Sequence, residues 1–114
     1  MKPNAFVVIF KTVLNLENQE TYNAYVAQMN TLVKKQEGYL SHLSFRNEDG
    51  LGLTLSYWEN EKTIAHWKKH AAHQKAQLEG KEKFYINYTL EIAQIKRSYS
   101  FPYKGDINFM VKPR

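Results

Sequence analysis

The chain has 114 residues, a formal net charge of +5, 43% hydrophobic and 14% aromatic residues, and no cysteine. This length and composition predict one folded domain, and the missing cysteine excludes disulfide scaffolds and thiolate chemistry. No apolar run reaches the roughly 18 residues of a membrane span, and no signal peptide is evident, so we expect a cytoplasmic protein without a membrane partner. The basic residues are spread along the chain rather than gathered in a stripe, so we also expect no nucleic-acid partner.

A strand and a helix are predicted first. Ala5 to Val13 is apolar at both parities over most of its length, which is typical of a strand in the centre of a sheet. Asn15 and Asn18 are candidate N-caps for a helix from Gln19 to Gln36, and Gly38 is a candidate C-cap. The helix has one apolar stripe at helical spacing, made of Tyr22, Tyr25, Val26, Met29, Leu32 and Val33.

A β-hairpin follows, with strands from Tyr39 to Arg46 and from Leu51 to Trp58 around an Asp-Gly turn. In the first of these strands, simple alternation puts Tyr39 on the side of Leu43 and Phe45, and His42 on the other. In the second strand, Gly52, Thr54, Ser56 and Trp58 share one side, and Leu51, Leu53, Leu55 and Tyr57 share the other. A face of Gly, Thr and Ser is small and slightly polar, and it could leave room for another backbone segment, a helix or a ligand.

A second helix is expected to begin at an Asn60 cap and to end at Gly80. Ile64, Trp67 and Ala71 would form its core stripe, with His66, His70 and His73 in a second stripe beside it. The last strand is expected from Phe84 to Phe101, and its apolar parity changes after Ile92, which indicates a β-bulge or a change of environment. Residues 1–101 would form the domain, and the tail 102–114 would either clasp a partner or be disordered.

The order β-α-β-β-α-β predicts an α+β fold of the ferredoxin-like type, an antiparallel sheet with two helices on one face. Such a sheet has a second apolar face, which a soluble monomer tolerates badly. We therefore expect a homodimer, with the sheet face of one copy against that of the other.

Four segments carry a family resemblance. They are the opening strand F-V-V-I-F-K-T, the helix end E-G-Y-L, the hairpin and helix start L-T-L-S-Y-W-E-N-E-K-T-I-A-H-W, and the closing strand Y-T-L-E-I-A-Q-I-K-R-S-Y. Over roughly Phe6 to Phe101 the chain resembles the antibiotic-biosynthesis-monooxygenase family. The resemblance implies a dimeric α+β barrel and cofactor-independent oxygenation of a small aromatic or polycyclic phenolic substrate.

Such a reaction needs an apolar slot for a flat ring system, a base, and hydrogen-bond donors for the enolate that forms when the base removes a proton. Trp67, Tyr57, Tyr25 and Phe45 are candidates for the slot. His70 or His73 is a candidate base, because imidazole titrates near neutrality, and Tyr22 or Tyr25 is a candidate donor. No cofactor and no metal are expected.

Three alternatives remain open from the sequence. Haem-degrading members of the family use an Asn near the position of Phe10 and an iron-binding His near the position of Gln77, and neither matches, although Trp67 does. His66, His70 and His73 would share a helical face and could bind Zn²⁺ or Ni²⁺ if the helix is continuous. The same scaffold could also be a non-catalytic, ligand-binding or stress-related homodimer.

Overall fold

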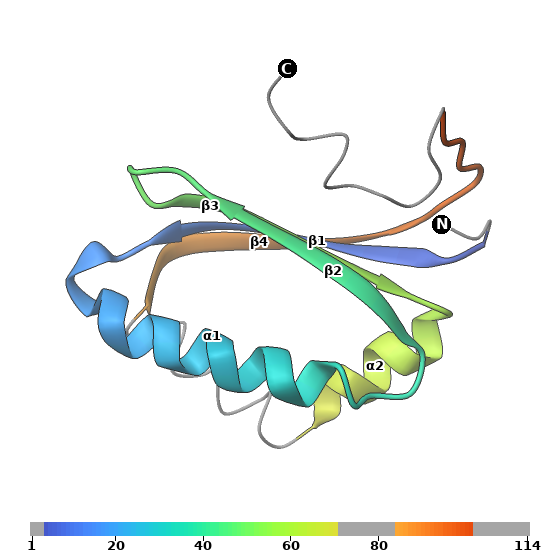
Figure 1. Ribbon diagram of the computed structural model, residues 1–114, viewed down its shortest axis with the longest axis horizontal. Helices are drawn as coiled ribbons and strands as arrows, with labels where there is room; N and C mark the ends of the chain where they lie inside the picture. Colours follow the sequence, from blue (N-terminus) through green and yellow to red (C-terminus); the bar gives the residue numbers. More distant parts are fainter. Residues whose placement is uncertain (1–3, 71–83, 102–114) are drawn as a thin grey trace.

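The computed structural model describes residues 4–70 and 84–101 (Figure 1). In chain order the elements are β1 (Phe6–Leu14), a 3-10 turn η1 (Leu16–Asn18), α1 (Gln19–Val33), β2 (Tyr39–Arg46), β3 (Leu51–Trp58), α2 (Glu61–Lys69) and β4 (Tyr85–Gln94). The predicted β-α-β-β-α-β order is confirmed. The predictions for residues 71–83, which include Ala71, His73 and Gly80, and for the tail 102–114, lie outside the described residues.

The four strands form one antiparallel sheet in the order β2-β3-β1-β4. β1 pairs with both β3 and β4, which is the central position that its apolar sequence predicts. Both helices lie against the same face of the sheet (Figure 1). The ferredoxin-like α+β fold is therefore confirmed, and we call the helix-covered side the inner face and the opposite side the outer face.

A bulge in β2 corrects the predicted side of Tyr39. Tyr39 pairs with Trp58 and Ser41 pairs with Tyr57, so Leu40 is an extra residue in β2. An extra residue shifts the alternation of side chains by one position. Tyr39 consequently shares the inner face with His42, not the face of Leu43 and Phe45.

A second bulge lies near the start of β4. Val13 pairs with Asn87 and Leu14 pairs with Tyr85, which leaves Ile86 without a partner, and its side chain is 69% exposed. The strand itself ends at Gln94, so the prediction that it extends to Phe101 was wrong. Its register against β1 is regular from Ile92 to Gln94, so of the two interpretations of the parity change the bulge is excluded.

The connections also differ in part from the expected caps. Asn60 caps α2 as predicted, because its side chain accepts a hydrogen bond from the Thr63 N–H at 2.9 Å. α1 ends three residues before Gln36, and Lys34, not Gly38, is its C-cap. Gly38 instead adopts φ +83° in the link to β2, where a Cβ atom would overlap Thr63 of α2. The link therefore passes directly against the second helix.

The buried core lies between the inner face and the facing sides of the helices. Trp58 is the most deeply buried aromatic residue among those described, at 1% exposure, and it packs with Val33, Ile64 and Trp67. The rings of Trp58 and Trp67 are stacked at 6.5 Å, and Tyr39 meets Trp58 edge-on. This cluster joins the end of α1 to α2 and fixes Trp67 over the sheet.

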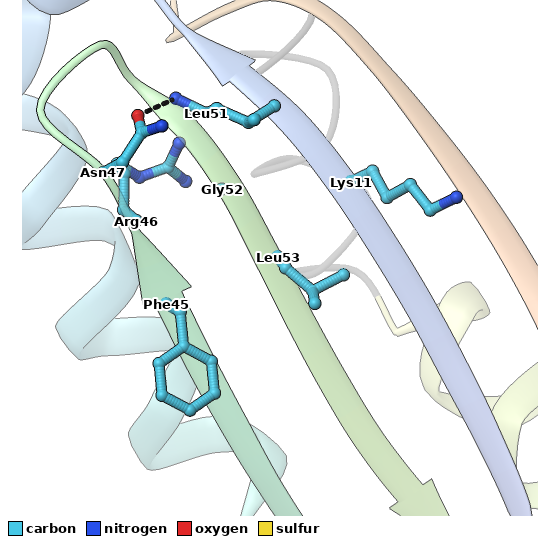
Figure 2. A pocket seen from close by; sticks show the side chains of 7 residues that line it. All are labelled: Lys11, Phe45, Arg46, Asn47, Leu51, Gly52 and Leu53. Atoms are coloured by element: carbon cyan, nitrogen blue, oxygen red, sulfur yellow. Dashed lines mark hydrogen bonds between the residues drawn. The ribbon is translucent and has the colours of Figure 1, made fainter.

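The outer face is mostly apolar over β1, β2 and β3 but polar along β4, where Asn87, Thr89 and Glu91 lie, and it is not covered by any of the elements described. The side chains of Phe45 and Leu51 are 57% and 56% exposed. Figure 2 shows Phe45, Leu53 and Lys11 side by side on β2, β3 and β1, around an open hollow. By strand alternation, the apolar residues that β1, β2 and β3 place on this face are Val7, Ile9, Val13, Leu43, Phe45, Leu51, Leu53, Leu55 and Tyr57.

Among the residues described, no helix is both long and apolar enough to cross a membrane.

Candidate functional site

A cavity of about 280 Å³ lies between the inner face of the sheet and the helices. All four strands and both helices contribute to its wall, which is the position expected for a ligand pocket in a fold with helices on one side of a sheet. It is lined by Val8, Phe10, Tyr22, Tyr25, Val26, Met29, Asn30, Val33, His42, Ser44, Thr54, Ser56, Ile64, Trp67, Lys68, Phe84, Tyr85, Leu90 and Ile92.

The half of the cavity floor formed by β2 and β3 is polar. His42 pairs with Ser56 and Ser44 pairs with Thr54, and all four side chains line the cavity. The hydroxyls of Ser44 and Thr54 are hydrogen-bonded at 2.8 Å. We call these four residues the polar strip. The small side chains of β3 thus leave the space that the sequence predicted.

The half formed by β1 and β4 is apolar. Val8 pairs with Ile92 and Phe10 pairs with Leu90, and all four side chains line the cavity. The polar strip is therefore bordered on the β1 side by hydrocarbon side chains. Leu90 and Ile92 are still 45% and 43% exposed, although they lie on the inner face. The cavity therefore has two unlike sides, which suits a flat ligand with an oxygen-bearing edge and a hydrocarbon edge.

His42 is a titratable group in this wall that the sequence did not single out. Its Nδ1 is 2.5 Å from the hydroxyl oxygen of Tyr39, and this contact depends on the bulge at Leu40. Burial, and secondly the positive charge of Lys34, lower the pKa of His42 from its ordinary value, and burial raises the pKa of Tyr39. At neutral pH the pair is therefore a neutral imidazole bonded to a neutral phenol.

A cluster around Tyr85 lies at the other end of the cavity. The rings of Tyr22 and Tyr85 are 5.7 Å apart, and the bulge at Ile86 turns Tyr85 to the inner face. Burial, followed by the neighbouring Tyr22, raises the pKa of Tyr85, while Arg46 opposes this shift. Tyr85 consequently keeps its proton and can act only as a neutral donor or acceptor.

The predicted slot and donor residues are only partly brought together. Trp67, Tyr22 and Tyr25 line the cavity. Tyr57 and Phe45 do not line it. Their neighbours in the chain, Trp58 and Ser44, point to the inner face, so the strands place Tyr57 and Phe45 on the outer face. The prediction that they share a slot with Trp67 is corrected by the alternation within β2 and β3.

The predicted histidines have separate environments. α2 ends at Lys69, and His70 has an extended backbone with ψ 130°, so His66 and His70 do not form part of one continuous helical stripe. His70 lies 5.7 Å from the ring of Trp67, and its buried Nδ1 has no hydrogen-bond partner among the described residues, yet His70 does not line the cavity. His66 is exposed. Residues 4–70 and 84–101 contain no cluster of three potential metal ligands.

Sequence reasoning missed His42, Arg46 and Tyr85. Gly52 was the available signal, because a glycine inside a strand marks a close approach by another group. Here that group is the guanidinium of Arg46, which a Cβ atom at Gly52 would overlap. The two bulges had no comparable signal in the chain.

The solved structures of other proteins agree with this architecture. A conserved protein from Methanosarcina mazei Go1 superposes with a TM-score of 0.74 at 14% identity, over 82% of this chain and 94% of that one. SnoaB, a cofactor-independent oxygenase from Streptomyces nogalater, superposes with a TM-score of 0.68 at 10% identity, over 88% of this chain and 99% of SnoaB. At such low identities the likeness shows the fold alone.

The sequence comparisons show the family. The family model for antibiotic biosynthesis monooxygenases matches residues 5–78. YqjZ of Bacillus subtilis, which is described as uncharacterised, is 35% identical over 100 residues, covering 88% of this chain and 87% of YqjZ. A jasmonate monooxygenase of Pyricularia oryzae is 26% identical over 95 residues, which are 82% of this chain but only 44% of that protein. The chain belongs to the antibiotic biosynthesis monooxygenase family.

Proposed function

We propose that the chain is a cofactor-independent monooxygenase for a small aromatic or polycyclic phenolic substrate. The observation that carries the proposal is the cavity with two unlike sides, in which a neutral imidazole and several hydroxyls face an apolar wall. Family membership supports monooxygenase chemistry, and SnoaB is a relative in fold that works without a cofactor. The jasmonate monooxygenase supports a small organic substrate.

The reaction would convert a ring methylene of the substrate to a carbonyl. A base removes one proton, and the electron pair stays on the substrate as an enolate. The enolate passes its electrons to O₂, a C–O bond forms, and the O–O bond then breaks with release of water. One CH₂ group and one O₂ become one C=O group and one H₂O, so no further reductant is needed.

We assign the base to His42. Its lowered pKa keeps the imidazole unprotonated near neutrality, as a base must be. The Nδ1–H would donate to the Tyr39 oxygen, which leaves Nε2 to accept the substrate proton. Tyr22 and Tyr25 keep the donor role expected from the sequence, and Trp67 forms part of the slot. His70 and His73 become the second choice for the base.

The test is O₂ uptake with anthrone, which has a ring methylene, and with 1,4-dihydroxynaphthalene, which has one in its keto tautomer, without added metal or cofactor. Because positioned general bases contribute about 10²-fold or more, His42→Gln should lower kcat by at least that factor, while the matched control His70→Gln should stay close to the wild type. Loss of uptake in His70→Gln alone would assign the base to His70, directly after the end of α2. Binding of these substrates without O₂ uptake would support the alternative of a non-catalytic binding protein.

We also propose that the protein is a homodimer in which the outer face of one copy covers that of the other. The exposed apolar side chains of β2 and β3 support this arrangement, since a solvent-exposed apolar face of this extent is characteristic of interaction surfaces.

A further inference from the structure

The guanidinium of Arg46 lies at one end of the polar strip, behind the tyrosines of the cavity wall. One of its terminal nitrogens, Nη2, donates to the Tyr22 hydroxyl at 2.9 Å and to Thr12 Oγ1 at 3.0 Å. The other, Nη1, donates to the Gly50 carbonyl oxygen at 2.6 Å. The side chain is half-buried. These bonds fix the guanidinium against the β2–β3 hairpin and α1.

Gly52 and Tyr22 complete the cradle of this side chain. Gly52 has no Cβ, which leaves the space that the guanidinium occupies. The Cζ of Arg46 lies 5.3 Å from the centre of the Tyr22 ring, within the range of a cation–π contact. The position of the charge is therefore set before any ligand binds, which lowers the entropic cost of binding one.

The acceptors that hold Arg46 are all neutral. They are two hydroxyls and one carbonyl, and among residues 4–70 and 84–101 the ion pair present joins Lys11 to Glu91 on the outer face. A half-buried charge is screened less by solvent than an exposed one. The end of the cavity near Tyr22 and Tyr85 therefore has a positive potential that these neighbours do not cancel.

Tyr22 connects this charge to the cavity. Because its oxygen accepts from Arg46, its own O–H must donate in another direction. Tyr22 and Tyr85 both line the cavity, and Tyr85 keeps its proton because burial raises its pKa. Tyr22 and Tyr85 are also hydrogen-bonded to each other, so this pair of phenols leaves one O–H to donate into the ligand space.

We propose that this end of the cavity is an anion subsite that binds the carboxylate of a ligand with a flat ring system, through Tyr22 and Tyr85 backed by Arg46. The carboxylate would accept from the phenol O–H that the hydrogen bond between Tyr22 and Tyr85 leaves available, and the rings would extend between the polar strip and the apolar side. The proposal takes from the proposed function that the cavity is the ligand site, and it does not require oxygenation.

The test compares binding of 2-naphthoate and of its neutral analogue 2-naphthamide at pH 7.5 by titration calorimetry. Hydrogen bonds to a charged group exceed those to a neutral one, so the wild type should bind the acid about 10-fold more tightly or better. Arg46→Met should bring the two affinities close together, and Arg46→Lys should restore part of the preference because it keeps the charge. Tyr22→Phe should also lower the preference for 2-naphthoate, and this variant removes only the hydroxyl while it keeps the ring and its packing.

Lys11→Met is the matched control, since it removes one positive charge from the outer face and should leave the preference unchanged. Equal binding of both probes by the wild type, no binding of either, or a preference that survives in both Arg46→Met and Tyr22→Phe would overturn the proposal. If the preference for 2-naphthoate also fell in Lys11→Met, the net charge of the protein would be its cause, and the subsite proposal would be overturned. A preference for 2-naphthoate without O₂ uptake would count against the oxygenase but support the anion subsite. O₂ uptake without a preference for 2-naphthoate would support the oxygenase but overturn the anion subsite.

Discussion

At the scale of single residues, the properties of His42 come from its neighbours rather than from its type. Three elements contribute to its environment: the bulge of β2 supplies the Tyr39 hydroxyl, β3 supplies Ser56 opposite, and the end of α1 supplies the charge of Lys34. Because burial and Lys34 both disfavour the imidazolium, His42 should titrate below the ordinary value of 6.5.

We predict that NMR titration will give His42 a pKa below 6.5. Lys34→Gln should raise this pKa but leave it below the ordinary value, since burial is the larger cause. Lys35→Gln removes the adjacent lysine and should have no effect, because no interaction with Lys35 contributes to the shift. If Lys34→Gln and Lys35→Gln raised the pKa of His42 equally, the net charge of the molecule, and not the specific proximity of Lys34, would be the cause.

The lowered pKa of His42 also makes the stability of the folded state depend on pH. The folded state binds the His42 proton more weakly than the unfolded chain, so folding is favoured by the neutral form. This contribution is complete above about pH 6.5 and is lost as the pH falls through the lower folded-state pKa. In denaturant titrations at several pH values, the free energy of unfolding of the wild type should fall more between pH 7 and 5 than that of His42→Gln. A larger fall in the variant would contradict the lowered pKa.

The sequence has no signal for His42 as a site residue, and for Arg46 its signal is indirect, the glycine at position 52. His42 reads as one member of a strand, and alternation alone puts Tyr39 on the other side of the sheet. Arg46 reads as an exposed residue next to a turn, and its burial depends on the register that sets Gly52 opposite to it. Tyr22, Tyr25 and Trp67 were found because helical spacing places them on the stripes that face the sheet.

At the scale of elements, α2 has nine residues, too few to be stable alone, and it holds Trp67 over the cavity. Its start is fixed by the Asn60 side chain, which accepts from the Thr63 N–H, and by the Thr63 hydroxyl, which donates to the Asn60 carbonyl. The cap was predictable because Asn directly before a helix has this local role. The helix end at Lys69 was not, because no glycine or proline marks it in the chain.

We predict that Asn60→Ala will lower the free energy of unfolding by about 1 kcal/mol, since it removes the acceptor for the first turn of α2. Asn60→Asp is the control, because it keeps an acceptor and adds a negative charge at the positive end of the helix dipole. Its stability should equal or exceed that of the wild type. Equal stability of all three proteins in urea titrations would show that the cap does not support α2.

At the scale of the whole molecule, residues 4–70 and 84–101 bury few large side chains completely. In the part of the chain that the structure describes, Leu14 and Trp58 are the largest side chains with less than 2% exposure. The outer face meanwhile exposes Phe45 and Leu51 by more than half. The sequence predicted this imbalance, because β1 is apolar at both parities whereas both helices fit on one face. A second copy on the outer face would correct it.

We predict a mass near twice 13.4 kDa by light scattering at micromolar concentration. Leu55→Lys places a charge in the middle of the outer face and should give a folded monomer or a large loss of dimer affinity. Leu16→Lys makes the same chemical change at a residue on η1 that is already 48% exposed, and it should leave the mass unchanged. A wild-type mass near that of one chain would show that the outer face is not a dimer interface.

The two ends of the cavity, one at His42 and one near Arg46, and its polar side together affect how a flat ligand is oriented. His42 lies in one cross-strand row of β2 and Arg46 lies four residues further along the same strand, with the apolar half of the floor to one side of both. Three different contacts that do not lie on one line determine which of its two faces a flat molecule turns towards the helices. An unsymmetrical ring system would therefore present the same face to the helices in every turnover. When oxygen adds to a carbon that becomes a stereocentre, chiral chromatography of the product should detect a single enantiomer.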